Sequence, residues 1–200
     1  MNLIRHLVIF ARTPRRGQVK RRLAAGIGDG QATVFYRQTA HRTVRLLSRD
    51  RRWLTYLAIT PDLDMENGYR WPLGTAKIAQ GQGGLGQRMA RVMRRLPPGP
   101  VVIVGTDLPD ISTTAIANAF SALGHADAVF GPAEDGGYWL VGLKRRPCIP
   151  DVFADVRWSS EHALADTLAN FSSNHRIAQL ETRRDIDDKT AYVSLKKSTR

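Results

Sequence analysis

The chain has 200 residues and a formal net charge of +12, and its length fits one domain. It has no apolar run long enough for a membrane-spanning helix, and the short apolar run at 7–11 is not typical of a signal peptide. Its single cysteine, Cys148, excludes an intramolecular disulfide and a cysteine-cluster zinc site. We therefore expect a cytoplasmic protein with one domain over residues 1–195.

The charge is unevenly distributed along the chain. The first hundred residues carry 19 Lys and Arg against 5 Asp and Glu, whereas the second hundred carry 11 against 13. A basic half can attract nucleic acid or a polyanionic small molecule such as a nucleotide, and an acidic half can hold a metal ion. Arginine richness that reflects only a GC-rich genome is the alternative.

Strands and helices are expected to alternate along the chain. The expected strands cover residues 3–11, 53–60, 76–80, 101–105, 126–130, 138–143 and 176–180. Helical patterns occur after Val19 (broken near 26–30 and resumed through Leu47), after the glycine segment 81–86, after a cap at Ser112 or Thr113, and after a cap at Ser159 or Ser160. The tail at 196–200 is expected to fray. This alternation predicts an α/β three-layer sandwich around a mostly parallel mixed sheet.

Asp107 follows the most distinctive strand of the sequence. Four β-branched apolar residues, Val101–Val104, predict a strand buried on both faces, and Gly105 and Pro109 end it. Ligands of open α/β sheets bind beyond the carboxyl ends of the strands. A carboxylate there is placed to hold a divalent cation against phosphate oxygens. A helix cap or a turn is the alternative for Asp107.

A basic loop follows the first expected strand and leads into a helix. It carries six cationic side chains, namely Arg12, Arg15, Arg16, Lys20, Arg21 and Arg22. Arginine forks and a lysine ammonium both bind phosphate, and the helix start adds backbone N–H groups. The spacing of a P-loop is absent. A solvated basic face is the alternative.

Three other segments carry candidate chemistry. In Gly131–Leu143, Glu134 and Asp135 precede two glycines, although a plain hairpin that turns at Asp135-Gly136 is the alternative. The carboxylates of 185–188 can share a cation, but their spacing alone favours a solvated acidic turn. The glycine-rich segment 80–89 can approach a base or sugar closely, or it can be a flexible loop.

Taken together, these motifs resemble the radical-SAM/selenodomain-associated transferase family of the nucleotide-diphospho-sugar transferase (GT-A-like) superfamily. The guanylyltransferases that act on 2-phospho-L-lactate and on the molybdenum cofactor are more distant relatives. The matching residues are Phe10-Ala-Arg12, Gly17, Lys20, Arg22, Leu23, Gly81, Leu85-Gly86, Arg88-Met89, Gly105-Thr-Asp-Leu-Pro109, Gly131-Pro132, Glu134-Asp-Gly-Gly-Tyr138, Trp158-Ser159 and Asp185-Ile-Asp187. The chain departs from the family pattern at Arg21, where Thr is usual, and at Gly84, where Asp is usual.

The resemblance implies a GT-A fold, a nucleotide lying over the first loop, and Mg²⁺ or Mn²⁺ held by Asp107, with Asp187 as a further metal ligand. The implied catalytic residues are Asp107, Asp135 and Lys20. The implied nucleotide-binding residues are Ala11, Arg12, Gly17, Lys20, Arg22, Gly86, Arg88 and Thr106. The implied acceptor-binding residues are Glu134, Gly136, Gly137 and Tyr138.

Three functions remain as alternatives. The leading one is glycosyl transfer from a nucleotide-diphospho-sugar to an acceptor that the sequence does not identify, and its rival is nucleotidyl transfer from a nucleoside triphosphate. An alternative of another class is a non-catalytic basic module that binds nucleic acid. We do not expect that partner, because few aromatic residues accompany the basic loop. Nor do we expect a membrane partner.

Overall fold

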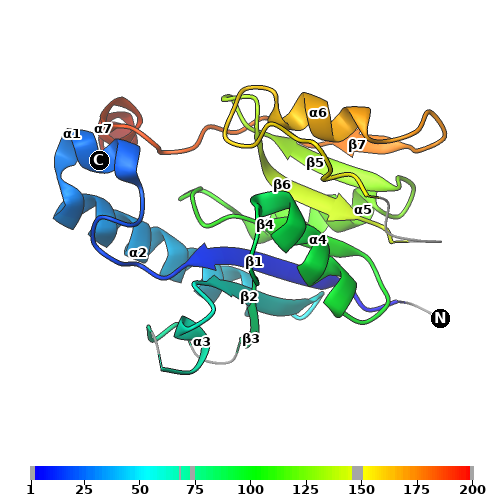
Figure 1. Ribbon diagram of the computed structural model, residues 1–200, viewed down its shortest axis with the longest axis horizontal. Coiled ribbons are helices and arrows are strands. Elements are labelled where there is room, and N and C mark those ends of the chain that lie inside the picture. The colour runs from blue at the N-terminus through cyan, green and yellow to red at the C-terminus, as the bar shows by residue number, and fades with distance from the viewer. Residues whose placement is uncertain (1–2, 68, 73–74, 146–150, 199–200) are drawn as a thin grey trace.

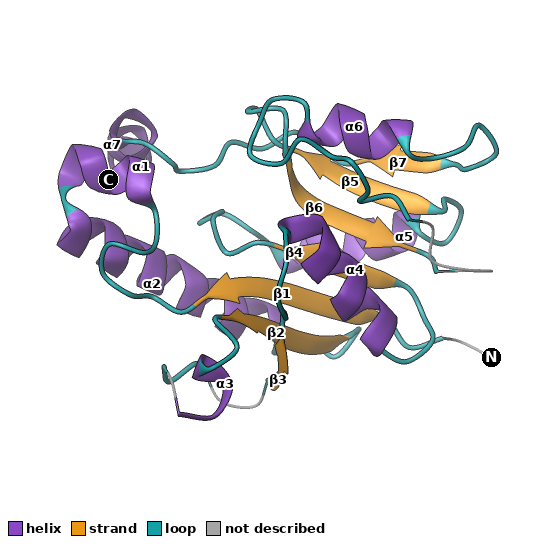
Figure 2. Ribbon diagram, in the orientation of Figure 1, coloured by secondary structure: helices purple, strands orange, loops and turns teal. Residues whose placement is uncertain are grey.

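The computed structural model describes residues 3–67, 69–72, 75–145 and 151–198, so Cys148 lies outside the described residues. In this part of the chain one seven-stranded sheet has the order β3-β2-β1-β4-β6-β5-β7 (Figures 1 and 2). The strands are β1 (His6–Arg12), β2 (Leu54–Thr60), β3 (Ala76–Ala79), β4 (Val101–Val104), β5 (Ala128–Pro132), β6 (Tyr138–Leu143) and β7 (Ile177–Gln179). Only β6 runs antiparallel to its neighbours, β4 and β5. The predicted mostly parallel mixed sheet is confirmed.

The helices of the described residues cover both faces of this sheet. They are α1 (Arg21–Ile27), α2 (Asp29–Leu47), α3 (Asp64–Asn67), α4 (Leu85–Arg95), α5 (Thr113–Ala122), α6 (Ala163–Ala169) and α7 (Lys189–Ser198). On one face α2 and α5 bury Val44, Ile116 and Phe120. On the other, α4 and the segment after residue 151 bury Met93 and Phe153. The three-layer sandwich is therefore also confirmed, and none of the described helices is long and apolar enough to cross a membrane.

The strand order reverses direction between β1 and β4. The first connections carry the chain from β1 outward to β2 and β3, and the next connection returns it to the other side of β1. At such a point the loops after two adjacent parallel strands diverge and leave a crevice between them. Here those loops are 13–20 after β1 and 105–112 after β4, so the basic loop and Asp107 flank the same crevice.

The glycines at 26–30 end one helix and start the next. Gly28 has a φ of 86°, a conformation that L-residues with side chains rarely adopt. It separates α1 from α2, as the sequence predicts. Helices α1 and α7 then lie side by side at one end of the molecule (Figure 1), where Gly26 packs closely against Lys189.

Several helix boundaries differ from the expected ones. Ser112 caps α5 as predicted, because its Oγ accepts from Ala115 N at 3.1 Å. Helix α6 begins at Ala163 rather than directly after Ser159 or Ser160, because Ser160 forms a turn in which its Oγ accepts from His162 N. Helix α7 continues to Ser198, so residues 196–198 are helical rather than frayed, and residues 199–200 lie outside the described residues. Asp188 caps this helix by accepting from Ala191 N at 2.8 Å.

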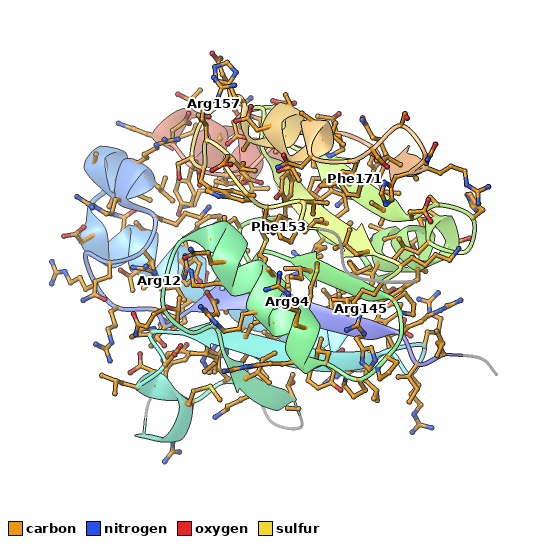
Figure 3. All side chains as sticks on the ribbon, turned by 45° about the vertical axis from the view of Figure 1, so that its right-hand side comes forward. Arg12, Arg94, Arg145, Phe153, Arg157 and Phe171 are labelled. Atoms are coloured by element: carbon orange, nitrogen blue, oxygen red, sulfur yellow. The ribbon has the colours of Figure 1, made fainter. Side chains whose placement is uncertain are left out.

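Arg145 closes the carboxyl end of α4, where Figure 3 places it. Its guanidinium donates to the carbonyl oxygens of Met93 at 2.6 Å and Gly99 at 2.6 Å, and also to that of Leu96 at 3.2 Å. These carbonyls lie in the last turn of α4 and in the segment that follows it. A cationic side chain from the end of β6 thus fixes the link between α4 and β4.

The β5–β6 turn is docked on the start of α6. Gly136 has a φ of 81°, its carbonyl oxygen accepts from Leu164 N at 3.0 Å, and a Cβ there would overlap the backbone of Glu161. We expect Gly136→Ala to lower the free energy of unfolding by about 3 kcal/mol, from backbone strain and overpacking together. Urea denaturation measures this change.

Gly30→Ala is the matched control. Gly30 lies in α2 with open space around its Cβ position, so alanine should stabilise the protein by roughly 0.5 kcal/mol through its helix propensity. Similar unfolding midpoints for the two variants would contradict the packing described for the turn.

Candidate active site

A cleft of about 410 Å³ opens at the carboxyl edge of the sheet. It lies at the crevice between β1 and β4, as the topology requires. Its lining combines apolar side chains with predicted site residues. Those predicted residues are Ala11, Arg12, Lys20, Thr106, Asp107 and Tyr138.

Lys20 joins two of the predicted carboxylates. Its Nζ lies 2.7 Å from Asp107 Oδ1 and 2.6 Å from Asp187 Oδ1. The side chain of Lys20 is only 4% exposed, whereas those of Asp107 and Asp187 are 44% and 42% exposed. Burial lowers the pKa of Lys20, but the charges and hydrogen bonds of Asp107 and Asp187 outweigh it and raise that pKa. The ammonium is therefore charged throughout the physiological pH range.

The backbone holds Lys20 in an uncommon conformation. Its φ of 47° and ψ of 48° place it in the left-handed region immediately before α1. Non-glycine residues rarely adopt this region, and they do so at turns and functional sites. The conformation turns the chain from the basic loop into α1.

Tyr36 links the end of β1 to the loop after β4 through its hydroxyl. Its hydroxyl accepts from Arg12 N at 2.9 Å and donates to Arg12 O at 3.0 Å, and it also accepts from Thr106 Oγ1 at 3.1 Å. Burial and the negative charge of Asp107 raise the pKa of Tyr36 to about 12. The neutral phenol thus ties the loop after β1 to the loop after β4.

The three carboxylates of segment 185–188 have three different surroundings. Asp188 caps α7, and Asp187 contacts Lys20. Asp185 is partly buried, and its buried Oδ1 has no hydrogen-bond partner among the described residues. Burial and the negative charge of Asp107 raise the pKa of Asp185 to about 7, with Asp187 and Asp135 adding to the effect.

Segment 181–184 brings these acids to the cleft. It continues past β7 along the end of β5, where Arg183 N donates to Pro132 O at 3.0 Å and Glu134 N donates to Arg183 O at 3.1 Å. This pairing carries the chain past the β5–β6 turn, and the influence of Asp135 on the pKa of Asp185 reflects how close the two acids lie.

Two guanidinium groups lie near each other at the cleft, that of Arg12 in its lining and that of Arg88 beside the lining residue Gln80. Arg88 donates to Gln80 Oε1 at 2.9 Å, and its buried Nε has no partner among the described residues. Burial and the positive charge of Arg12 lower the pKa of Arg88, so the two guanidinium groups are close enough to repel each other. An anion bound between them would relieve this repulsion.

Gln80 forms the floor between these groups. Its amide nitrogen donates to Ala58 O at 2.8 Å and to Ala11 O at 3.2 Å. The following loop is also fixed, because Arg91 donates to the carbonyl oxygens of Gln80 at 3.0 Å and Gln82 at 2.7 Å. These hydrogen bonds hold the start of the glycine-rich segment in place beside the cleft, as is not expected of a flexible loop.

The predicted acceptor residues lie at the β5–β6 turn, so the hairpin alternative describes their backbone correctly. Asp135 is exposed, and its Oδ1 accepts from Gly137 N at 3.0 Å. Glu134 is also exposed, 3.8 Å from Arg184. The ring of Tyr138 lines the cleft, whereas its hydroxyl lies 3.5 Å from Thr167 Oγ1.

Four predicted nucleotide-binding residues do not line the cleft, namely Gly17, Arg22, Gly86 and Arg88. Gly17 forms an exposed turn with a φ of 74°. Arg22 is exposed on α1 and has no ion pair among the described residues. Gly86 lies under Phe153 and Trp158, where a Cβ would overlap both. Its absent side chain therefore allows α4 to pack closely against the segment after residue 151.

The residues present fit a divalent cation held by two carboxylates. Across the described ranges, no group of three or more His, Cys, Asp or Glu side chains is arranged to hold a metal. However, Asp107 and Asp187 already share one cation, the ammonium of Lys20. Mg²⁺ is commonly bound by one or two carboxylates, with water and substrate phosphates completing its coordination. A site with two protein ligands matches that donor set.

The sequence reasoning missed Tyr36 and Gln80 as site residues. The helical spacing of Tyr36 indicates burial but carries no signal for a hydroxyl that bonds across two loops. Gln80 directly precedes the glycines of segment 80–89, and this position is the sequence feature that could have indicated it as a site residue. Asp185 was recognised only as one member of an acidic run.

The chain is similar to a known family and to several solved structures. The family model described as "Uncharacterized protein conserved in bacteria (DUF2064)" matches residues 43–160, which is more than half of the chain. The chain belongs to the DUF2064 family. No curated protein matches the sequence. The DUF2064 match includes β4 with Asp107 and the β5–β6 turn with Asp135, whereas Lys20 and Asp187 lie outside it.

Solved structures share the fold over almost the whole chain. A Desulfovibrio desulfuricans G20 protein, provisionally named a nucleotide-diphospho-sugar transferase, is 27% identical, with a TM-score of 0.89 over 98% of this chain and 87% of that one. The 4-diphosphocytidyl-2C-methyl-D-erythritol synthase of Anaerococcus prevotii DSM 20548 is 11% identical, with a TM-score of 0.62 over 98% of both chains. Rv0371c of Mycobacterium tuberculosis H37Rv, in a complex with manganese, is 17% identical, with a TM-score of 0.54 over 98% of both. The fold of this DUF2064 protein is thus that of nucleotide-diphospho-sugar transferases.

The raised pKa of Asp185 predicts a pH dependence of stability in the metal-free protein. The unfolded carboxyl has a pKa of about 3.9, so between there and about 7 the folded protein binds more protons than the unfolded chain. The free energy of unfolding therefore falls as the pH rises through this window. Asp185→Asn removes this loss, and the advantage of the variant over the wild type should grow by roughly 2 to 4 kcal/mol.

Urea denaturation in a chelator at pH 4.5 and pH 7.5 measures this difference. Taking the difference between variant and wild type cancels the contributions of groups that both proteins share. A variant whose advantage over the wild type is the same at both pH values would show that Asp185 is ionised at both.

Proposed function

We propose that this protein is a divalent-metal-dependent transferase that uses a nucleotide-activated donor, most specifically a glycosyltransferase acting on a nucleotide-diphospho-sugar. The observation that carries the proposal is the shared contact of Asp107 and Asp187 with one buried cation in the cleft at the β1–β4 crevice. The name given to the Desulfovibrio relative points to the same chemistry, as does the motif resemblance to the radical-SAM/selenodomain-associated transferases.

The two walls of the cleft suit the two ends of such a donor. Among the described residues neither Arg12 nor Arg88 forms an ion pair, and the buried Nε of Arg88 has no partner. Arginine binds phosphate oxygens through a planar fork. Asp107 and Asp187 would hold Mg²⁺ or Mn²⁺, which when bound neutralises diphosphate charge and stabilises the leaving group. Manganese in the Rv0371c structure supports this choice of ion.

Lys20 has a positioning and an electrostatic role in this proposal. Its buried ammonium holds the two carboxylates together before the cation binds. A fixed positive charge beside a developing diphosphate lowers the energy of the transition state. The acceptor would enter over the β5–β6 turn, where Glu134, Asp135, Gly136 and Gly137 are accessible.

Asp107→Asn tests the metal site directly. We expect it to abolish the metal-dependent part of nucleotide binding, because the amide loses the charge that a divalent cation requires. The fold should remain intact, since Asp187 still neutralises Lys20. Isothermal titration calorimetry with nucleoside diphosphates and sugar nucleotides, with and without Mn²⁺, measures the loss.

Asp110→Asn is the matched control for this experiment. It removes the same charge from the same loop, but the side chain of Asp110 is 68% exposed and lies near Arg183 rather than Lys20. Metal-dependent binding that survives Asp107→Asn would refute the assignment of Asp107 as a metal ligand.

Nucleotidyl transfer from a nucleoside triphosphate is the second candidate. The excess of cationic side chains in the loop 12–22 favours it, because a triphosphate carries more negative charge than a nucleotide sugar. The diphosphocytidyl product named for the Anaerococcus relative belongs to this chemistry.

Product analysis separates the two reactions. With a sugar nucleotide and Mn²⁺ we expect slow release of a nucleoside diphosphate, with water as the default acceptor, and no pyrophosphate from nucleoside triphosphates. Chromatography of the nucleotides and a pyrophosphate assay measure both products. Pyrophosphate release that depends on Asp107 would instead establish the second candidate.

A further inference from the structure

A groove of about 770 Å³ runs along the outer surface of α2. Its walls are the carboxyl half of α2 and the segment at residues 69–70, and it shares no lining residue with the cleft of the candidate active site. Five arginines line it, namely Arg37, Arg42, Arg45, Arg49 and Arg70. Among the described residues, no acidic side chain contributes to the lining.

Among the described residues, the arginines of this groove have no ion-pair partner, in contrast to others on the same protein. Arg52 pairs with Asp50 at 2.6 Å, and Arg157 pairs with Asp166 at 2.8 Å. Within the described part of the chain, none of the five groove arginines has a hydrogen bond or ion pair to a side chain. Like charges three residues apart on a helix, such as Arg42 and Arg45 on α2, destabilise it. A bound anion would offset this repulsion.

The rest of the lining is held in place. The Tyr69 hydroxyl lies 2.6 Å from His41 Nε2, and both rings pack against Trp71. Burial and the positive charges of Arg45 and Arg37 lower the pKa of His41, which favours a neutral ring in this hydrogen bond with Tyr69. This contact fastens the wall that carries Arg70 to α2.

The length of the groove selects an extended ligand. From Arg37 to the end of α2 at Leu47 the helix rises roughly 15 Å, and Arg49 extends the groove into the turn that follows. A nucleic-acid strand with stacked bases carries one phosphate per roughly 3.4 Å, so it presents about five charges over this length. An extended acidic peptide presents side chains to one face only every second residue, roughly every 7 Å, and so offers only two or three. The phosphates of one small nucleotide would reach only part of the groove.

We propose that the arginine groove of α2 binds a chain of phosphate groups, as present in a single nucleic-acid strand or in inorganic polyphosphate. Arginine rather than lysine supplies the cations, and its fork matches phosphate oxygens. The expectation against nucleic acid rested on the basic loop after β1, which is a different surface. The groove and the proposed transferase are independent, since Tyr36 faces the cleft while Arg37 faces the groove.

Fluorescence anisotropy with a labelled single-stranded oligonucleotide tests the proposal, with unlabelled polyphosphate and polyglutamate as competitors. Arg45→Gln/Arg49→Gln should weaken binding roughly 20-fold at 0.1 M salt. It should also make the slope of log affinity against log salt less negative by about 1.4, because two phosphate contacts are lost. Arg45→Lys/Arg49→Lys keeps the charge but lacks the fork, so its affinity should be intermediate.

Arg94→Gln/Arg95→Gln is the matched control. It removes the same charge from exposed positions on α4, on the other side of the sheet (Figure 3), and its affinity should stay within about twofold of the wild type. Circular dichroism checks that each variant is folded. Asp107→Asn should bind the oligonucleotide as the wild type does.

The competitors identify the source of the phosphates. An oligonucleotide that polyphosphate displaces only weakly supports a nucleic-acid strand, whereas displacement by polyphosphate at a lower phosphate concentration supports polyphosphate. The proposal is overturned if the oligonucleotide does not bind, if polyglutamate competes equally well, or if the control variant loses as much affinity as the groove variant. Loss of binding in Asp107→Asn would also overturn it, because it would place the ligand in the cleft.

Discussion

The ammonium of Lys20 between Asp107 and Asp187 is the contact on which the rest of the site depends. Two carboxylates so close together would repel each other strongly without a cation. The desolvation of a buried lysine is in turn tolerable only because both carboxylates face it. Lys20 therefore stabilises both carboxylates and they stabilise its charge in return. The contact with Asp187 joins parts of the chain that are 167 residues apart.

The architecture around this contact serves to bring its members to one edge of the sheet. Strands β1 and β4 lie next to each other and deliver the loops with Lys20 and Asp107. Tyr36 fixes these loops to each other through its hydroxyl. On the other side, the segment after β7 pairs with the end of β5 and carries Asp185 and Asp187 past the β5–β6 turn. Because β6 alone is antiparallel, that turn also opens toward the same edge.

The sequence predicts the strands that position this site better than it predicts the side-chain contacts within it. Val101–Val104 identifies a buried strand because a two-sided sheet requires continuous apolar character, and Asp107 then follows at the correct edge. No local sequence pattern predicts the contact between Lys20 and Asp187, because hydrophobic periodicity and residue spacing do not indicate contacts between residues so far apart in the chain. Helix α7 was missed because its packing partner, α1, lies at the other end of the chain. Tertiary contacts rather than local propensity determine such helices.

The participation of Asp187 also has a consequence for the order in which the protein matures. During synthesis, β1 to β4 and their helices can pack before residue 187 has been made. Until then Lys20 has only Asp107 as a partner, and the remaining carboxylate arrives with the segment that leads into α7. The contact of Lys20 with both carboxylates is thus among the last parts of the domain to be assembled, so a chain that is interrupted after β7 would contain most of the core but lack one of the two carboxylates around Lys20.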